Sequence, residues 1–199
     1  MNTQTHLLVA AAVLARPGQP VRNAAVLAGA LLPDLSIYAL FACSRFADVP
    51  EREVWDVIYW SPPWQAASAV SNSAPLWLAV AGLGAVLMRA GRARIGLILA
   101  VLGAAALLHL ALDFPVHVED AHRHVWPLSD WRFRSAVSYW NPAHHGRWVS
   151  VAEAVLGLAL CVILWRRFKA WWVRGLLATC VIAYIAVPAY WIFLSGVAD

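Results

Sequence analysis

The sequence predicts an all-α membrane protein, a polytopic bundle of about five transmembrane helices with a short N-terminal helix packed among them. Hydrophobic residues make up 62% of the 199 residues and charged residues only 13%, and the mean hydropathy of +0.64 is too high for an ordinary soluble domain. Apolar runs recur along the chain, separated by polar or basic segments. Twelve tryptophans, many near the ends of these runs, are typical of the aromatic belts at a bilayer interface.

The first apolar run, residues 6–15, is too short to span a bilayer, which needs roughly 20 residues. We expect it to form a short helix packed among the spans. A signal peptide is the alternative, but no basic residue precedes the run and a histidine lies within it. Residues 16–22, with two prolines and a glycine, predict a turn before the next helix.

The first full span is predicted at residues 23–43 and is interrupted by Pro33 and Asp34. Proline loosens the backbone hydrogen-bond ladder of a spanning helix, and a carboxylate beside it in hydrocarbon needs a cation or a donor. The structural alternative is that Asp34 caps the backbone that Pro33 breaks. Residues 44–73, of mixed charge, predict an interfacial loop with at most a short amphipathic helix.

The remaining spans are predicted at residues 74–88, 95–113, 149–165 and 172–194. Pro115 disfavours a helical conformation at the residue before it, so the third span should end there. We expect the long polar segment that follows, residues 114–148, to be an outer-face loop that forms part of a functional site. No internal repeat divides the chain, and a single membrane-embedded domain is predicted.

The distribution of basic residues predicts the orientation. The connections at residues 16–22, 89–94 and 166–174 hold 2, 3 and 4 Lys or Arg residues, which is 9 of the chain's 15. Alternating connections place all three on one side, which the positive-inside rule identifies as cytoplasmic. We therefore predict a multi-pass protein of a bacterial inner membrane whose polar loops face the periplasm or the cell exterior. Because the basic residues lie in short turns, nucleic-acid binding is not expected.

The stretch at residues 109–124, HLALDFPVHVEDAHRH, carries four of the chain's seven histidines. His109 and Asp113 are four residues apart, so on a helix both side chains project from one face. Hydrocarbon does not solvate such groups, and an intramembrane His and Asp indicate a functional site. The alternative is a hydrogen-bonded pair that stabilises the end of the helix.

His6 and Asp34 lie at depths compatible with His109 and Asp113. With a rise of 1.5 Å per residue, the four positions fall roughly 14 to 27 Å above the basic turns. A shared ion would compensate groups that each helix would otherwise bury without a partner. We therefore predict that these residues bind a divalent metal ion, with Zn preferred and Mn or Fe as alternatives. For His6 alone, a capping or solvent-facing role is the alternative.

The outer loop adds further candidates. We expect His117 and His124 to be additional metal ligands, and Asp120 or His122 to shuttle a proton in catalysis. For each of these histidines the alternative is a surface residue without a function.

Arginine and aromatic side chains alternate at residues 126–142. Arg132 and Arg134 are predicted to bind an anionic group such as a lipid phosphate, since guanidinium groups match phosphate geometry. Aromatic anchoring at the headgroup level is the plainer interpretation. The expected partners are accordingly membrane lipid and an anionic, lipid-like substrate.

Several short motifs occur in a recognisable order: an early histidine, GALLPD at residues 29–34, and His109 followed four residues later by Asp113. In this the chain resembles a bacterial family of membrane-bound, metal-dependent hydrolases, itself distantly similar to zinc-dependent phospholipase C and the S1/P1 nucleases. The resemblance covers residues 6 to about 124 and implies His6, Asp34, His109 and Asp113 as metal ligands.

One position departs from that family, which usually has a His-Ser pair before the second apolar span. Here the corresponding residues are Ser71, Asn72 and Ser73. Because Asn72 is a poorer ligand, either the loop histidines replace the missing one or the site binds fewer ions.

We therefore expect a metal-dependent hydrolase acting on phosphoester bonds of lipid or lipid-linked substrates, in which the ion supplies hydroxide near neutral pH. Two other classes are alternatives. A metal-ion or proton transporter would need polar residues toward the cytoplasmic side, and residues 97–108 contain almost none. A haem-binding protein would need histidines on facing helices, for which only His6 and His109 qualify.

Overall fold

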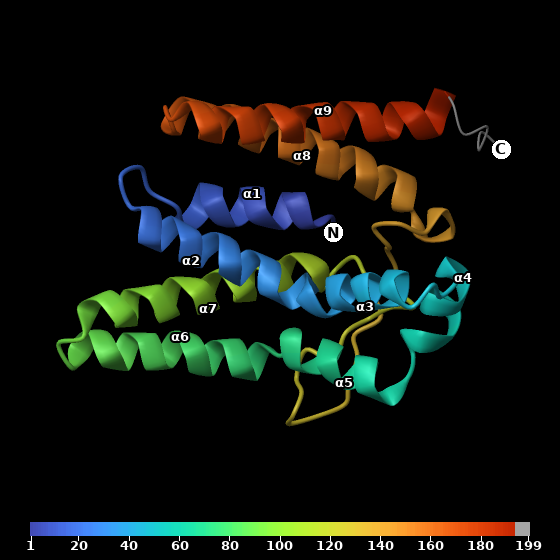
Figure 1. The fold of residues 1–199 in the computed structure, drawn as a ribbon, viewed down its shortest axis with the longest axis horizontal. Coiled ribbons are helices and arrows are strands. Elements are labelled where there is room, and N and C mark those ends of the chain that lie inside the picture. The colour runs from blue at the N-terminus through green and yellow to red at the C-terminus, as the bar shows by residue number, and fades with distance from the viewer. Residues whose placement is uncertain (194–199) are drawn as a thin grey trace.

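A computed structural model describes the backbone of residues 1–193 and the side chains of residues 1–186. The described chain contains helices and no strands, as the sequence predicts (Figure 1). The elements are α1 (Thr3–Leu14), α2 (Pro20–Leu31), η1 (Leu32–Asp34), α3 (Leu35–Phe46), α4 (Glu51–Glu53), η2 (Val54–Ile58), α5 (Pro62–Ser71), α6 (Ala74–Arg89), α7 (Ala93–Asp113), η3 (Pro142–His144), α8 (Gly146–Arg167) and α9 (Trp171–Phe193).

The prediction of a helical membrane bundle is confirmed. In the described part of the chain, four helical segments are long and apolar enough to cross a membrane: Pro20–Phe46, Pro62–Arg89, Ala93–Asp113 and Gly146–Arg167. The predicted fifth span corresponds to α9, and its predicted last residue, Leu194, lies outside the described residues. The short N-terminal helix is α1, which packs among α2, α7 and α8.

The predicted interfacial loop at residues 44–73 is largely helical, which corrects the sequence interpretation. It contains α4, the short π-helical segment η2 and all of α5, and the second span begins at Pro62. Two prolines occupy the first turn of α5, where the missing N–H groups would have no helical partner. The proline pair therefore starts a helix here. Ser73 caps the next helix by accepting a hydrogen bond from the amide of Leu76.

The three basic connections lie at the same end of the bundle, on the left in Figure 1. The α3–α5 region and the irregular segment before α8 occupy the opposite end. This arrangement confirms that the basic turns share one side. The 3₁₀ turn η1 contains Pro33 and Asp34 and interrupts the first span where the sequence places the proline.

Close helix contacts around α7 fix the position of η1. Gly29 of α2 lies directly against the backbone carbonyl of Leu102, where a side chain would overlap it. Gly84 of α6 and Gly96 of α7 make a similar backbone approach. Small residues allow membrane helices to gain dispersion contacts in this way. The Asp34 carboxylate is thereby held beside the end of α7.

Candidate metal centre

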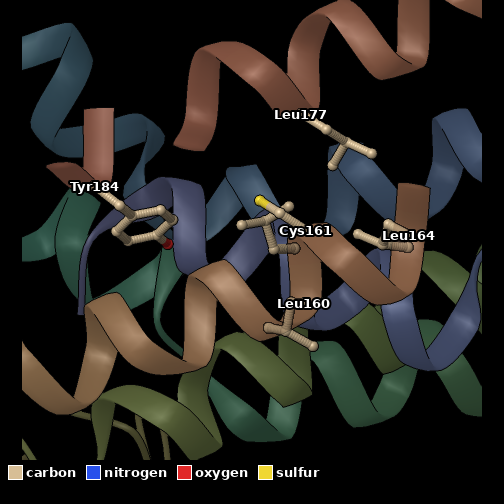
Figure 2. Close-up of a cluster of buried hydrophobic side chains, with 6 residues drawn as sticks. Leu160, Cys161, Leu164, Leu177 and Tyr184 are labelled. Carbon is tan, nitrogen blue, oxygen red and sulfur yellow. The ribbon is translucent and has the colours of Figure 1, made fainter. Parts of the chain in front are cut away.

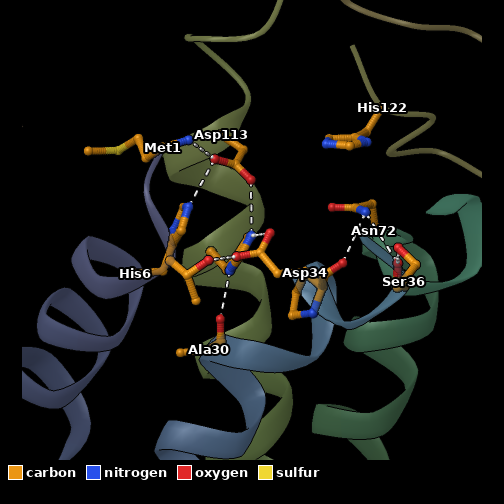
Figure 3. Close-up of polar contacts among 12 residues, drawn as sticks. Met1, His6, Ala30, Asp34, Ser36, Asn72, Asp113 and His122 are labelled. Atoms are coloured by element: carbon orange, nitrogen blue, oxygen red, sulfur yellow. Dashed lines mark hydrogen bonds and ion pairs between the residues drawn. The ribbon is translucent and has the colours of Figure 1, made fainter. Parts of the chain in front are cut away.

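Asp113, the last residue of α7, is the centre of a buried polar cluster (Figure 3). Its Oδ1 lies 3.0 Å from Nε2 of His6, and its Oδ2 lies 3.0 Å from Nε2 of His109. Nε2 of His109 also lies 3.4 Å from Oδ1 of Asp34. The four residues that the sequence predicts as ligands thus meet, from α1, η1 and α7.

The ring nitrogens that face these carboxylates are not hydrogen bonded. Nε2 of His6 and Nε2 of His109 are buried, and neither has a hydrogen-bond partner among the described residues. Nδ1 of His109 lies 2.7 Å from the carbonyl oxygen of Ala30, which can only accept, so Nδ1 carries the hydrogen. In a neutral ring the lone pair of Nε2 then points at the carboxylates, and a cation between them relieves the repulsion.

The spacing of these atoms fits a coordination shell. Metal–ligand bonds of 2.0 to 2.2 Å place neighbouring ligand atoms about 2.8 to 3.6 Å apart in octahedral or tetrahedral geometry. The His6–Asp113 and His109–Asp113 contacts of 3.0 Å fall within this range, and ligand atoms of all three residues lie within 4.8 Å of one another. Imidazole nitrogen with carboxylate oxygen suits Zn, Mn or Fe. The cluster therefore has the donor set and the spacing of a divalent metal site.

Neighbouring groups hold these ligands in place. The His6 ring stacks on the His109 ring, with centroids 3.6 Å apart and planes 12° from parallel. Thr3 donates a hydrogen bond of 2.5 Å to Oδ2 of Asp34. The amino group of Met1 donates a hydrogen bond of 2.5 Å to Oδ1 of Asp113. Such supporting contacts orient metal ligands and restrict their rotamers.

A second group of ligand atoms shares Asp113. Atoms of Asp113, His117 and His122 lie within 4.8 Å of one another, and all these residues are buried. Nε2 of His117 lies 3.4 Å from Oδ1 of Asp113, and its Nδ1 lies 3.0 Å from Oδ2 of Asp120. Nδ1 of His122 contacts the Ser68 hydroxyl at 3.2 Å. Asp113 could therefore bridge an inner and an outer ion.

The two outer histidines, His117 and His122, have pKa values shifted in opposite directions. Burial lowers the pKa of His117, but the carboxylates of Asp113 and Asp120 outweigh it, so the pKa is raised. Burial, together with the neighbouring His117, lowers the pKa of His122 to about 3. Burial also raises the pKa of Asp120, but its contact with His117 outweighs this and the pKa is lowered. His122 is thus neutral and Asp120 ionised at physiological pH.

The remaining predicted residues lie outside these two groups. Nδ1 of His124 donates to the backbone carbonyl of Asn72 at 3.2 Å, and His124 belongs to neither ligand group in the described chain. Arg132 donates to the Ala121 carbonyl at 2.7 Å and to Oε1 of Gln65 at 2.8 Å, so it fastens the outer segment to α5. Arg134 is exposed.

The sequence predicts Asn72 only as a poor substitute for a histidine ligand, and the structure adds that it is buried beside the site. Asn72 is 1% exposed, and its Nδ2 donates to the carbonyls of Ser68 and Pro33. Its Oδ1 is buried without a hydrogen-bond partner, and Figure 3 shows it beneath His122, directed toward the side where Asp34 lies. The signal was its position, since it occupies the place of the expected histidine.

Sequence reasoning missed a buried carboxylate, Glu153 of α8, which is 2% exposed. Its Oε1 accepts hydrogen bonds from the Thr5 hydroxyl at 2.6 Å and the Asn2 amide at 2.7 Å. Tyr184 contacts the same hydroxyl at 2.5 Å. A lone acidic residue in the predicted span at 149–165 was the available signal.

The chain matches no protein-family model, and searches of curated proteins and of solved structures returned no match. The resemblance to membrane-bound hydrolases therefore stays a prediction from the sequence motifs.

Proposed function

We propose that this protein is a membrane-bound, metal-dependent hydrolase that cleaves phosphoester bonds of lipid or lipid-linked substrates at the outer face of a bacterial inner membrane. The observation that supports the proposal most is the buried Asp113 carboxylate, which faces ring nitrogens of His6, His109 and His117. Those Nε2 atoms have no hydrogen-bond partner among the described residues. If these histidines had only a structural role, they would be expected to form aligned N–H···O bonds with Asp113, as the Met1 amino group does.

The residues divide into two ligand sets in this proposal. His6, His109 and Asp113 hold one divalent ion, with Asp34 beside them, while Asp113, His117 and His122 hold a second. Zinc is the preferred ion, with Mn or Fe as alternatives. Bound divalent ions supply Lewis acidity and a source of hydroxide near neutral pH.

Outer-segment residues perform the remaining tasks. Oδ2 of Asp120 lies 3.0 Å from Nδ1 of His117 without an aligned hydrogen bond, and on the other side of the ring Nε2 faces Asp113. In the proposal this carboxylate orients the His117 ring. Oδ1 of Asp120 is buried without a hydrogen-bond partner in the described chain and is available to accept a proton. His124 supports the site from outside, because its Nδ1 is bound to the Asn72 carbonyl.

The position of the site favours a lipid phosphoester. Asp113 ends α7 at the end away from the basic α6–α7 turn. The neighbouring outer segment exposes the Trp131, Phe133 and Trp140 side chains, and Trp140 donates a hydrogen bond to Asp120. Aromatic side chains of this kind lie at the headgroup level of membranes. Arg134 is exposed on the same segment and supplies a cation for an anionic headgroup.

The structure gives less support to the alternative functions. Below the site, the core between α1, α2 and α7 consists of apolar side chains such as Ala10, Val26 and Val101, so these helices offer no polar path for an ion. The rings of His6 and His109 stack 3.6 Å apart, which leaves no space for a porphyrin between them. Transport and haem binding therefore explain the cluster less well.

The test is to measure metal content and phospholipid hydrolysis on the same purified protein. The wild type should retain stoichiometric divalent metal and release water-soluble phosphate headgroups from vesicles. His109→Ala with Asp113→Ala should abolish both. The control pair His144→Ala and His145→Ala removes histidines outside the two ligand groups and should change neither. Equal metal in all three proteins would rule out the proposal.

A further inference from the structure

A groove separates α8 and α9 near their basic connection, far from the metal centre. Its volume is 420 Å³, and it is lined by apolar side chains that include Cys161, Trp165, Leu177 and Val181. Cys161 and Leu177 also belong to the buried cluster of Figure 2, so the floor of the groove is well packed. The volume lies within the roughly 300 to 1,000 Å³ of small-molecule sites.

Uncompensated positive charge lies at this groove. Arg166 lines it and forms no hydrogen bond or ion pair with the described residues. The Arg174 guanidinium lies over the Trp165 ring, 5.1 Å from its centroid, and its Nε is buried without a partner in the described chain. No Asp or Glu occurs between Glu153 and the end of the chain at Asp199. Arg167 differs, because it donates to the Ala12 carbonyl.

We propose that this groove binds an anionic phospholipid, with one acyl chain between α8 and α9 and the phosphate against Arg166 and Arg174. Guanidinium groups bind phosphate oxygens through charge-assisted, often bidentate hydrogen bonds. Basic pockets between transmembrane helices are suited to anionic headgroups for this reason. The apolar side chains that line the groove pack against the acyl chain, and Arg166 at its edge and the neighbouring Arg174 supply the positive charge.

A second copy of this chain fits the groove less well. A two-fold contact places the same surface of each copy together, so Arg166 and Arg174 would meet their own like charges. The α8 residues that line the groove, Cys161, Val162, Trp165 and Arg166, lie near the C-terminus of that helix, beside the basic connection that Figure 1 shows at the end of the bundle opposite the α3–α5 region. The bound lipid is therefore distinct from the substrate of the proposed hydrolase, and this inference does not depend on that function.

Native mass spectrometry of the detergent-purified protein with added phosphatidylglycerol or phosphatidylcholine tests the proposal. We expect phosphatidylglycerol to remain bound in preference to phosphatidylcholine. Arg166→Gln with Arg174→Gln should weaken phosphatidylglycerol binding by roughly tenfold or more, as expected for the loss of charge-assisted hydrogen bonds. Arg89→Gln with Arg92→Gln removes the same charge from the exposed α6–α7 connection and should retain the lipid.

A second variant tests the apolar part of the site. Ala178→Trp fills the groove while every charge is kept, and it should also lose the lipid. Helical content and metal retention serve as folding controls for both variants. Equal retention of the two lipids, or equal loss in the control pair, would overturn the proposal. A lipid-free dimer that the groove variants disrupt would show instead that a second copy occupies the groove.

Discussion

Helix α1 contacts two buried carboxylates through neighbouring residues, and the two carboxylates have very different surroundings. Thr5 donates to Glu153 of α8, whose Oε1 also accepts from a backbone amide. His6 faces Asp113 of α7 through Nε2 without forming a hydrogen bond. Oε1 of Glu153 therefore accepts from donors that carry hydrogens, while its Oε2 is buried without a partner in the described chain. Asp113 accepts one hydrogen bond from the Met1 amino group and otherwise faces three imidazole nitrogens that form no hydrogen bond with it.

This difference indicates that α1 contributes both to the stability of the fold, through Thr5, and to the candidate metal centre, through His6. Hydroxyl and amide donors satisfy a buried carboxylate and fix its position, which is a structural role. Imidazole nitrogens beside a carboxylate suit a cation. The Glu153 contacts hold the first turn of α1, and that turn carries His6 to Asp113. We interpret Glu153 as an anchor and Asp113 as the shared ligand.

The largest effect is expected when the charge of Asp113 is removed, and the matched substitution of Glu153 is the comparison. Asp113→Asn removes the charge common to both ligand groups and should weaken metal binding by more than roughly 100-fold, beyond the range for groups that only support ligands. Glu153→Gln keeps an acceptor for Thr5 and should bind metal as the wild type does. Chelator competition with elemental analysis measures both affinities. Similar losses in the two variants would remove the distinction.

A second change tests the outer ligand group. Asp120→Asn leaves Nδ1 of His117 without its carboxylate, and we expect a 10- to 100-fold loss in affinity for the outer ion, the usual effect of removing a supporting carboxylate. Glu119→Gln is the matched control, because Glu119 contacts His144 at the surface. Titration of each metal-depleted variant with the divalent ion measures its affinity for the outer ion. An unchanged affinity in Asp120→Asn would contradict the role assigned to His117.

Much of the inner cluster could be predicted from the sequence because one pair is local and the other two residues lie at a matching depth. The spacing of His109 and Asp113 fixes their common face, and helical rise fixes the depth of His6 and Asp34. The role of Arg132 could not be predicted, because its acceptors are a loop carbonyl and Gln65, brought together by the tertiary fold. The burial of Asn72 could not be predicted for a similar reason, since it depends on α5, in a region where the sequence predicts an interfacial loop with at most a short amphipathic helix.

A third change tests the anchor. Glu153→Leu leaves the Thr5 hydroxyl and the Asn2 amide without their acceptor, and should lower the free energy of unfolding by about 1 to 3 kcal/mol. The folded Glu153→Leu variant should still bind metal with far higher affinity than the Asp113→Asn variant. Denaturant titration in mixed micelles measures the change in stability. Unchanged stability together with lost metal would place Glu153 in the metal site instead.

The smallest expected effect concerns Tyr184 of α9. Tyr184→Phe removes one interhelical hydrogen bond to Thr5, and such bonds contribute about 0.6 kcal/mol on average in membrane proteins. Metal content should not change. The same denaturant titration provides the measurement, and a drop in metal content would show that the α8–α9 region and the metal centre are coupled.

X-ray absorption at the metal edge of the purified protein tests the central claim most directly. A site built from His6, His109 and Asp113 predicts nitrogen and oxygen ligands at about 2.0 to 2.2 Å, with scattering from imidazole rings that decreases in His109→Ala. A shell containing sulfur, the spectrum of a hydrated ion, or an imidazole signal unchanged in His109→Ala would contradict it.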